Sequence, residues 1–280
     1  MKQLLLFITL FALIGTPMVY ADSLSMNISD TTPYQGDTVT VSFTGGAKPE
    51  SVLFDGKRFS FFTYRRNPMA VIPILAAQKA GTYPLIVTFV GGTTFTRSLR
   101  VRARKFVVVN LGIPKELGLT TEGLTTKLAE QKVSIDSTVK EKTDKVYFEK
   151  AFGLPLANNR TISSTYGEIR KTGDSVIRHW GIDIKGRAGA AVGAMSGGVV
   201  KSVYFDTVYG NVIIIDHGEG IFSLYMHLQK QNVKEGDIVE RGTVIGTVGS
   251  TGYSTAPHLH LSLKVNSISV DPIRFVMGFK

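Results

Sequence analysis

The chain has 280 residues, enough for one large or two smaller domains, and its 43% hydrophobic content with 29 glycines argues against disorder. It contains no cysteine, which excludes disulfides, a thiol nucleophile and a cysteine-ligated zinc site. The formal net charge of +10 suits an anionic polymer or a lipid surface, and because the sequence has no basic and aromatic platform we expect no nucleic-acid partner.

The first 21 residues have the layout of a secretory signal peptide. Lys2 gives a positive start, residues 4–14 form an apolar run, and a small-x-small pattern that ends at Ala21 follows the break at Gly15 and Pro17. The alternative is an uncleaved membrane anchor, but the run is short for a span of about 20 residues. We therefore expect an exported protein, periplasmic or extracellular, without a stable transmembrane segment after removal of the signal.

Residues 22–105 are predicted to form a small immunoglobulin-like β-sandwich. Residues 38–43 (TVTVSF) alternate apolar and polar side chains, and glycine-containing turns recur at hairpin-like intervals along the segment. Near its end, the alternation of a strand puts Arg100, Arg102 and Arg104 on one face. We interpret this face as solvated; a contact with a polyanion is the alternative.

Residues 106–157 are predicted to be a short helical connector. The segment is polar and poor in glycine, and Thr121 is a candidate N-cap. The positions with roughly helical spacing are Leu124, Leu128, Gln131, Ile135 and Val139. Residues 158–280 are then rich in glycine and β-branched residues, with short strands divided by glycine turns, which favours an antiparallel β domain. The whole chain is therefore expected to be mainly β.

Chemically reactive side chains concentrate in this last region, which holds all five histidines. They are His179, His217, His227, His258 and His260. In RHWGIDI, His179 stands four residues before Asp183, and Gly181 between them indicates a bend that enters a strand. In STAPHLHLSL, His258 and His260 are two apart, so a strand places both imidazoles on one face and the leucines on the other.

Two side chains from this bend and one from the His-Leu-His strand make a three-point site for a divalent metal. Two neutral imidazoles and one carboxylate suit zinc, and three protein ligands leave a fourth position for water, as in catalytic zinc sites. Such an ion brings the pKa of its water to roughly 7 and polarises a carbonyl. The alternative for the histidine pair alone is polar filling of a solvent-facing strand.

Four motifs of this region resemble the lysostaphin/LytM-type zinc metallopeptidases in order and spacing. They lie roughly within residues 160–276 and read HWGIDI, IDHGEGIFSLYMHL, VKEGDIVERGTVIGTVGSTG and PHLHLSL. The resemblance implies an antiparallel LytM-type sheet that holds one Zn²⁺ per chain through His179, Asp183 and His260. It also implies that His227 and His258 are the catalytic histidines, without dividing their roles.

Other residues near these motifs have two interpretations each. Tyr225 stands two residues before His227 and would share its groove-facing side as a substrate contact, or else pack as an aromatic. His217 lies in a turn signal and has no ligand role in the resemblance, so we expect it to stabilise the turn or face solvent. Trp180 either rims the groove or covers the core. The weaker candidates for lining the groove are Asn211 and Ser254.

The resemblance implies a secreted zinc metalloendopeptidase that hydrolyses the peptide cross-links of bacterial peptidoglycan with a metal-activated water. Because no polyglycine-binding module is recognisable, a D-Ala–diaminopimelate bond is favoured over glycine bridges, and the choice stays open. The alternatives are a non-catalytic LytM-fold regulator of cell-wall hydrolases and an envelope-binding protein. A groove blocked by the N-terminal region or the connector is a further alternative.

Overall fold

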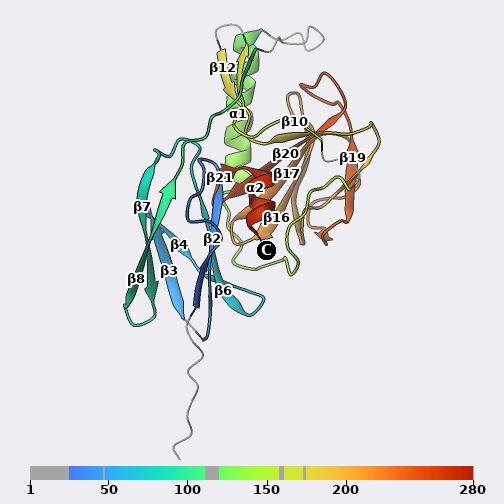
Figure 1. Cartoon of the computed structure of the whole chain (residues 1–280). Helices are drawn as coiled ribbons and strands as arrows, with labels where there is room; N and C mark the ends of the chain where they lie inside the picture. Colours follow the sequence, from blue (N-terminus) through green and yellow to red (C-terminus); the bar gives the residue numbers. More distant parts are fainter. Residues whose placement is uncertain (1–24, 47, 111–119, 158–160, 173–174, 280) are drawn as a thin grey trace, which may run out of the picture.

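The structure, a computed structural model, describes residues 25–46, 48–110, 120–157, 161–172 and 175–279. Two β-rich units lie side by side, and helix α1 (Thr121–Thr138) stands beside the second unit (Figure 1). The predicted signal peptide, with its cleavage after Ala21, lies outside the described residues. No helix in the described part of the chain has the length and apolar character needed to cross a membrane. The expectation of a mainly β chain is confirmed.

The first unit consists of two four-stranded antiparallel sheets. In spatial order, one sheet contains β1 (Ser25–Ile28), β2 (Thr38–Thr44), β6 (Asn67–Pro73) and β5 (Phe62–Tyr64). The other contains β4 (Lys57–Ser60), β3 (Pro49–Phe54), β7 (Gly81–Phe89) and β8 (Thr94–Val101). Alternate side chains of both sheets, such as Val39, Val52 and Leu85, form one core between them. Asp55 and Gly56 turn the chain between β3 and β4 with φ of 45° and 72°.

The three arginines near the end of β8 do not share a solvated face, so this prediction was wrong. The strand ends before Arg102, and its alternation of faces ends with it. Arg100 is exposed, whereas Arg102 stacks on a tyrosine ring, 3.8 Å from its centre. Arg104 is half-buried and forms ion pairs with Asp37 of the first unit and Asp271 of the second. The last of the three therefore joins the units.

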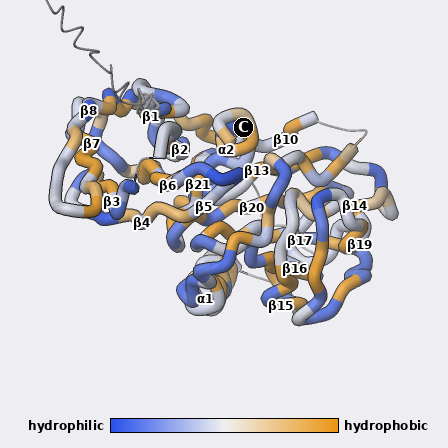
Figure 2. The backbone as a smooth tube through the Cα atoms, turned by 90° about the horizontal axis from the view of Figure 1, so that it is seen from below, coloured by the Kyte–Doolittle hydropathy of each residue, from blue (hydrophilic) through white to orange (hydrophobic). Residues whose placement is uncertain are grey.

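The connector contains helix α1, close to where its spacing predicts it. The hydroxyl oxygen of Thr120 accepts a hydrogen bond from the Gly123 amide at 3.1 Å, so the cap lies one residue before the predicted Thr121. Ile135 and Val139 pack on the large sheet of the second unit. Figure 2 shows α1 mostly in hydrophilic and intermediate colours, which fits a helix that buries only a narrow apolar stripe.

The second unit is built around a ten-stranded sheet. Its main path runs in the order β10 (Ile162–Ser164), β13 (Ile182–Lys185), β20 (His258–Val265), β17 (Ile221–Gln231), β16 (Gly210–Gly218), β15 (Gly198–Asp206) and β18 (Ile238–Val239). The strands attached to this path are β14 (Ala191–Gly193), β19 (Val244–Val248) and β21 (Ile268–Val270). A separate sheet contains β12 (Ser175–Arg178), β11 (Ile169–Thr172) and β9 (Val108–Asn110). Helix α2 (Pro272–Gly278) follows β21.

The two units share buried side chains. Tyr64 of the first unit contacts Phe148 and Phe279, with ring centres 5.4 and 5.3 Å apart. Met69 and Val71 of the first unit belong to the same buried cluster, which continues into the core of the large sheet. Contacts of this kind hold two units in one arrangement. The predicted domain limits, after residues 21, 105 and 157, stay predictions.

Candidate metal centre and active site

Strand β20 places two imidazoles on one face of the large sheet, as its sequence predicts. His258 and His260 line an open cavity on that face, whereas the alternate leucines of the strand are fully buried in the core. Asp183 on β13 lies directly opposite His260 in the antiparallel register. Side chains that are opposite each other in such a pair share a face, so the carboxylate and the imidazole are neighbours.

The bend before β13 brings His179 to the same place. The His179 backbone N–H donates to the carbonyl oxygen of Glu168 at 2.9 Å, which fixes the chain as it enters the bend. At Gly181, an added Cβ atom would lie 2.7 Å from His260 Nε2 and 2.5 Å from the Leu261 carbonyl oxygen. Only glycine lets the bend approach β20 this closely.

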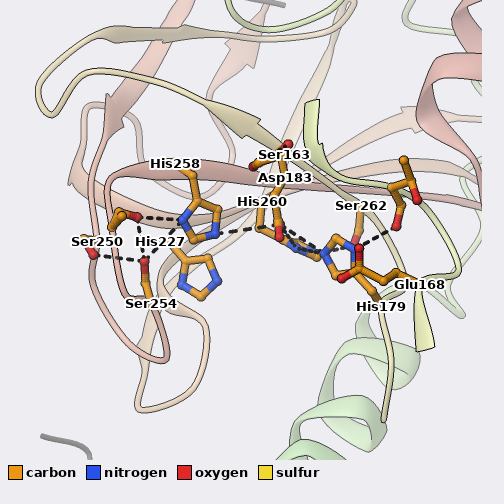
Figure 3. A network of polar contacts seen from close by, with 12 residues as sticks. Ser163, Glu168, His179, Asp183, His227, Ser250, Ser254, His258, His260 and Ser262 are labelled. Atoms are coloured by element: carbon orange, nitrogen blue, oxygen red, sulfur yellow. Dashed lines mark hydrogen bonds and ion pairs between the residues drawn. The ribbon is translucent and has the colours of Figure 1, made fainter. Parts of the chain in front are cut away.

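His179, Asp183 and His260 form a triangle of ligand atoms (Figure 3). His179 Nε2 lies 2.9 Å from His260 Nδ1 and 3.0 Å from Asp183 Oδ1, and the third side, from His260 Nδ1 to Asp183 Oδ1, is 2.8 Å. All three side chains are buried. The structure thus brings together the three residues that the resemblance implies as zinc ligands.

The surroundings of the two imidazoles indicate which ring nitrogens carry lone pairs. His179 Nδ1 donates to the Thr165 carbonyl oxygen at 3.0 Å, so Nε2 is unprotonated in the neutral ring. Ser262 donates its hydroxyl proton to the Trp180 carbonyl oxygen and therefore accepts from His260 Nε2 at 2.9 Å. This leaves His260 Nδ1 unprotonated, and burial lowers the pKa of His260 to about 4.

Three acceptor atoms therefore converge on one point. Asp183 is the anionic member of the three, because the Arg170 guanidinium donates to its Oδ2 at 2.8 Å and so favours the carboxylate form. Acceptors this close together repel one another unless protons or a cation lie among them. Two imidazole nitrogens and one carboxylate oxygen suit zinc, which competes with protons for such ligands. The residues present fit a divalent cation.

His227 and His258 lie beside this triangle. His258 Nε2 is 3.7 Å from Asp183 Oδ1, and the ring centres of His227 and His258 are 4.8 Å apart. Nδ1 of His227 donates to the Thr251 carbonyl oxygen, and Nδ1 of His258 donates to the Ala256 carbonyl oxygen, both at 2.8 Å. Nε2 is then the unprotonated nitrogen of each neutral ring. Burial is the main cause that lowers the pKa of His227 to about 3.

His227 reaches the site because its backbone interrupts the alternation of β17. Its φ of 60° is a left-handed conformation that is uncommon for non-glycine residues, and the pairing of β17 with β16 shifts register nearby. Tyr225 therefore does not share its face, and that expectation was wrong. Tyr225 is fully buried, and its hydroxyl oxygen accepts from the Met195 amide at 2.8 Å. The interpretation of Tyr225 as a packed aromatic is confirmed.

His217 lies in the core, away from the triangle. It is fully buried on β16, with Nδ1 2.7 Å from the Gly197 carbonyl oxygen and Nε2 2.7 Å from the Ser223 hydroxyl. Burial lowers its pKa to about 4. The expectation of a turn-stabilising or solvent-facing histidine was wrong, because β16 extends through His217 to Gly218 and the side chain is buried in the core.

A cavity of about 1050 Å³ contains the triangle and both neighbouring histidines. Trp180 and Ser254 line it, and Trp180 is 40% exposed, as expected of a residue at the rim. Asn211 does not line it, since its side-chain amide donates to a backbone carbonyl oxygen instead. Helix α1 forms one wall through residues such as Leu128, and residues 75–77 of the first unit contribute as well. The connector therefore borders the site.

The sequence reasoning missed the groups that hold the ligands in place. Ser262 orients His260, and its position two residues later on the same strand face was an available signal. Arg170 on β11 donates from Nη2 to Asp183 Oδ2 at 2.8 Å. No local pattern marks Arg170, because only the fold brings its strand to the ligands.

Comparisons with known proteins find similarity in the segment that contains the ligand triangle. Residues 177–272 match the family described as peptidase family M23. Lysostaphin from Staphylococcus simulans is 44% identical over 104 residues, which are 35% of this chain and 21% of the relative. The peptidoglycan DD-endopeptidase ShyC from Vibrio cholerae is 33% identical over 126 residues, which are 44% of this chain and 29% of the relative. The chain thus matches less than a third of either relative's length.

One solved structure extends the likeness in fold beyond this segment. A Pseudomonas aeruginosa protein provisionally assigned to peptidase M23 aligns over 88% of this chain and 96% of its own, with a TM-score of 0.65. At 24% identity, this likeness concerns the fold alone. The arrangement of both units therefore has a counterpart in a crystal structure.

Proposed function

Residues 177–272 belong to peptidase family M23, and from this premise we propose that the chain is an exported zinc metalloendopeptidase that hydrolyses the peptide cross-links of bacterial peptidoglycan. The observation that carries the proposal is the convergence of the His179, Asp183 and His260 ligand atoms within 3.0 Å of one another. The peptidoglycan endopeptidase among its relatives and the net charge of +10, which suits an anionic polymer, support the substrate class.

In this proposal, His179, Asp183 and His260 hold one zinc ion. When bound, zinc supplies Lewis acidity, which polarises a scissile carbonyl and lowers the pKa of a water molecule to about 7. The protein keeps the ligand lone pairs pointed inward, because Thr165 and Ser262 hold the outer nitrogens of the two imidazoles. No rearrangement of the rings is then needed before the reaction.

His227 and His258 would handle the proton. Each has its outer nitrogen on a backbone carbonyl oxygen, so the unprotonated Nε2 can accept the proton that water releases when it attacks the amide carbon. The same proton can then be donated to the departing amine. Burial lowers the pKa of His227, so its ring is neutral at pH 7 and Nε2 carries a lone pair. Both histidines are therefore proposed as catalytic residues.

The test is digestion of purified sacculi of two kinds, cross-linked either by D-Ala–diaminopimelate bonds or by glycine bridges, with mass analysis of the released muropeptides. We expect the full chain to release products, and the kind of sacculus digested identifies the bond. A chelator or His260→Ala should abolish release, and added zinc should restore the chelated wild type. Lys171→Gln, at an exposed position of β11, is the control that should change nothing.

Two outcomes would contradict the proposal. Release that survives both the chelator and His260→Ala would show that this site does not perform the hydrolysis. Binding to sacculi without any release would instead support the envelope-binding or regulatory alternative.

A further inference from the structure

A short hairpin outside the large sheet brings an arginine to the candidate metal centre. Strand β11 pairs with β12 and, in parallel, with β9 of the connector, so Arg170 lies between Ile177 and Val109 in the three-stranded sheet. Residues in this register share a face. The carboxylate of Asp183 lies on the side to which Arg170 points. The connector thus supports the strand that presents Arg170.

Arg170 joins two buried carboxylates. Its Nη2 donates to Asp183 Oδ2 at 2.8 Å, and its Nε donates to Glu168 Oε1 at 3.0 Å. The exposed fractions of the side chains are 19% for Arg170 and 9% and 8% for the two acids. Asp183 therefore divides its oxygens, with Oδ1 in the ligand triangle and Oδ2 on the guanidinium.

Glu168 contacts both Arg170 and the ligand residue His179. Its carbonyl oxygen accepts from the His179 backbone N–H at 2.9 Å, while its carboxylate holds Arg170. Glu168 is buried. The Glu168–Arg170 pair thus touches two of the three ligand residues from the same short segment.

We propose that Arg170 is a positioning residue that fixes the orientation of Asp183 for metal binding, and that Glu168 holds Arg170 in place. The inference rests on the proposed function, because it assumes that the triangle binds a metal. A carboxylate held at one oxygen can rotate less, so the other oxygen stays on the ion. The planar guanidinium can satisfy two carboxylates at once, which a lysine ammonium does less well.

Charge and geometry predict opposite effects for Arg170, which makes the proposal testable. Considered as a charge alone, a guanidinium near the triangle repels a cation, so its removal would tighten metal binding. Considered as a positioning group, it stabilises the bound ion, so its removal would weaken binding about 10- to 100-fold. Arg170→Lys separates these effects further, since it keeps the charge and loses the fork.

The experiment is competition for zinc between a chromophoric chelator and the full chain at neutral pH. We expect one zinc per wild-type chain and about 10- to 100-fold weaker binding for Arg170→Gln, with a smaller loss for Arg170→Lys. Lys171→Gln removes an equal charge from the neighbouring, exposed position and should bind zinc like the wild type. Thermal unfolding of the metal-free variants verifies that each one is folded.

The outcomes separate this inference from the proposed function. Unchanged or tighter zinc binding by folded Arg170→Gln, beside a wild type that binds zinc, would overturn the positioning role alone. A wild type that binds no zinc would overturn both. If Arg170→Gln does not fold, the affinity of Arg170→Lys decides, and an affinity equal to that of the wild type overturns the positioning role.

Discussion

His217 is the one histidine that the structure places wholly outside the candidate metal centre. Burial without a charged partner disfavours its protonated form, which is why its pKa falls to about 4. The unfolded chain binds this proton near pH 6.5, well before the folded chain does. The contribution of neutral, buried His217 to the free energy of unfolding is therefore fully present above pH 6.5. It is lost as the pH falls from 6.5 to 4.

We expect this loss to reach about 3 kcal/mol of the free energy of unfolding by pH 4. NMR titration of the imidazole signals of the metal-free protein should show His217 neutral down to about pH 5. A His217 signal that titrates near 6.5 in the folded protein would contradict the assignment. His217→Asn should reduce the pH dependence of stability between pH 6.5 and 4, because the proton acceptor is gone.

Gly181 sets the distance between the bend and β20. In Gly181→Ala the new methyl group would displace His260 Nε2 or the Leu261 carbonyl oxygen, which lie within 2.7 Å of it. We expect a loss of about 1–3 kcal/mol in stability and of about tenfold or more in zinc affinity. Gly278→Ala is the matched control, because nothing lies within 4 Å of its added Cβ atom. Equal zinc affinities of the two variants would show that the bend can move freely.

Helix α1 borders the site, so loosening the helix should change access to the site. It forms one wall of the cavity and is attached to the large sheet through Ile135, which is 5% exposed. Ile135→Ala should lower the free energy that holds the helix on the sheet by about 2–5 kcal/mol. We expect faster amide hydrogen exchange within residues 121–138 and a higher rate on cross-linked sacculi relative to a short soluble peptide.

The control for this variant is Val133→Ala on the same helix. Val133 is 71% exposed, so its truncation should alter neither the exchange nor the ratio of the two rates. If Ile135→Ala raises the exchange but leaves that ratio unchanged, the helix does not limit the approach of the polymer. The alternative of a groove blocked by the connector would then be contradicted for α1.

The elements that could be predicted from the sequence are those whose pattern is local. The alternation in β20 indicated the two imidazoles on one face, and helical spacing indicated α1 to within a residue of its cap. His227 does not follow the alternation of faces along its strand. Its own backbone is left-handed, so its side chain does not share the face of Tyr225. The position of Arg170 depends on the parallel pairing of β9 with β11, and no periodic pattern in the sequence predicts this pairing.

The two units share one buried core, so we expect them to unfold together. Phe148 is 2% exposed and packs against Tyr64 of the first unit and Phe279 of the second. It precedes the predicted peptidase domain, which starts at residue 158. A shortened chain that begins there would therefore lose part of its own core as well as the support that β9 gives to β11.

Phe148→Ala should accordingly destabilise both units together. We expect a loss of about 3–5 kcal/mol and a single unfolding transition in which signals from both units change at the same denaturant concentration. Phe205→Ala is the control, since Phe205 is 64% exposed and its loss should shift the midpoint little. Two separate transitions, with only one shifted by Phe148→Ala, would mean that the units fold independently. In that case the interface around Tyr64 would contribute little to stability, and a shortened peptidase chain should fold by itself.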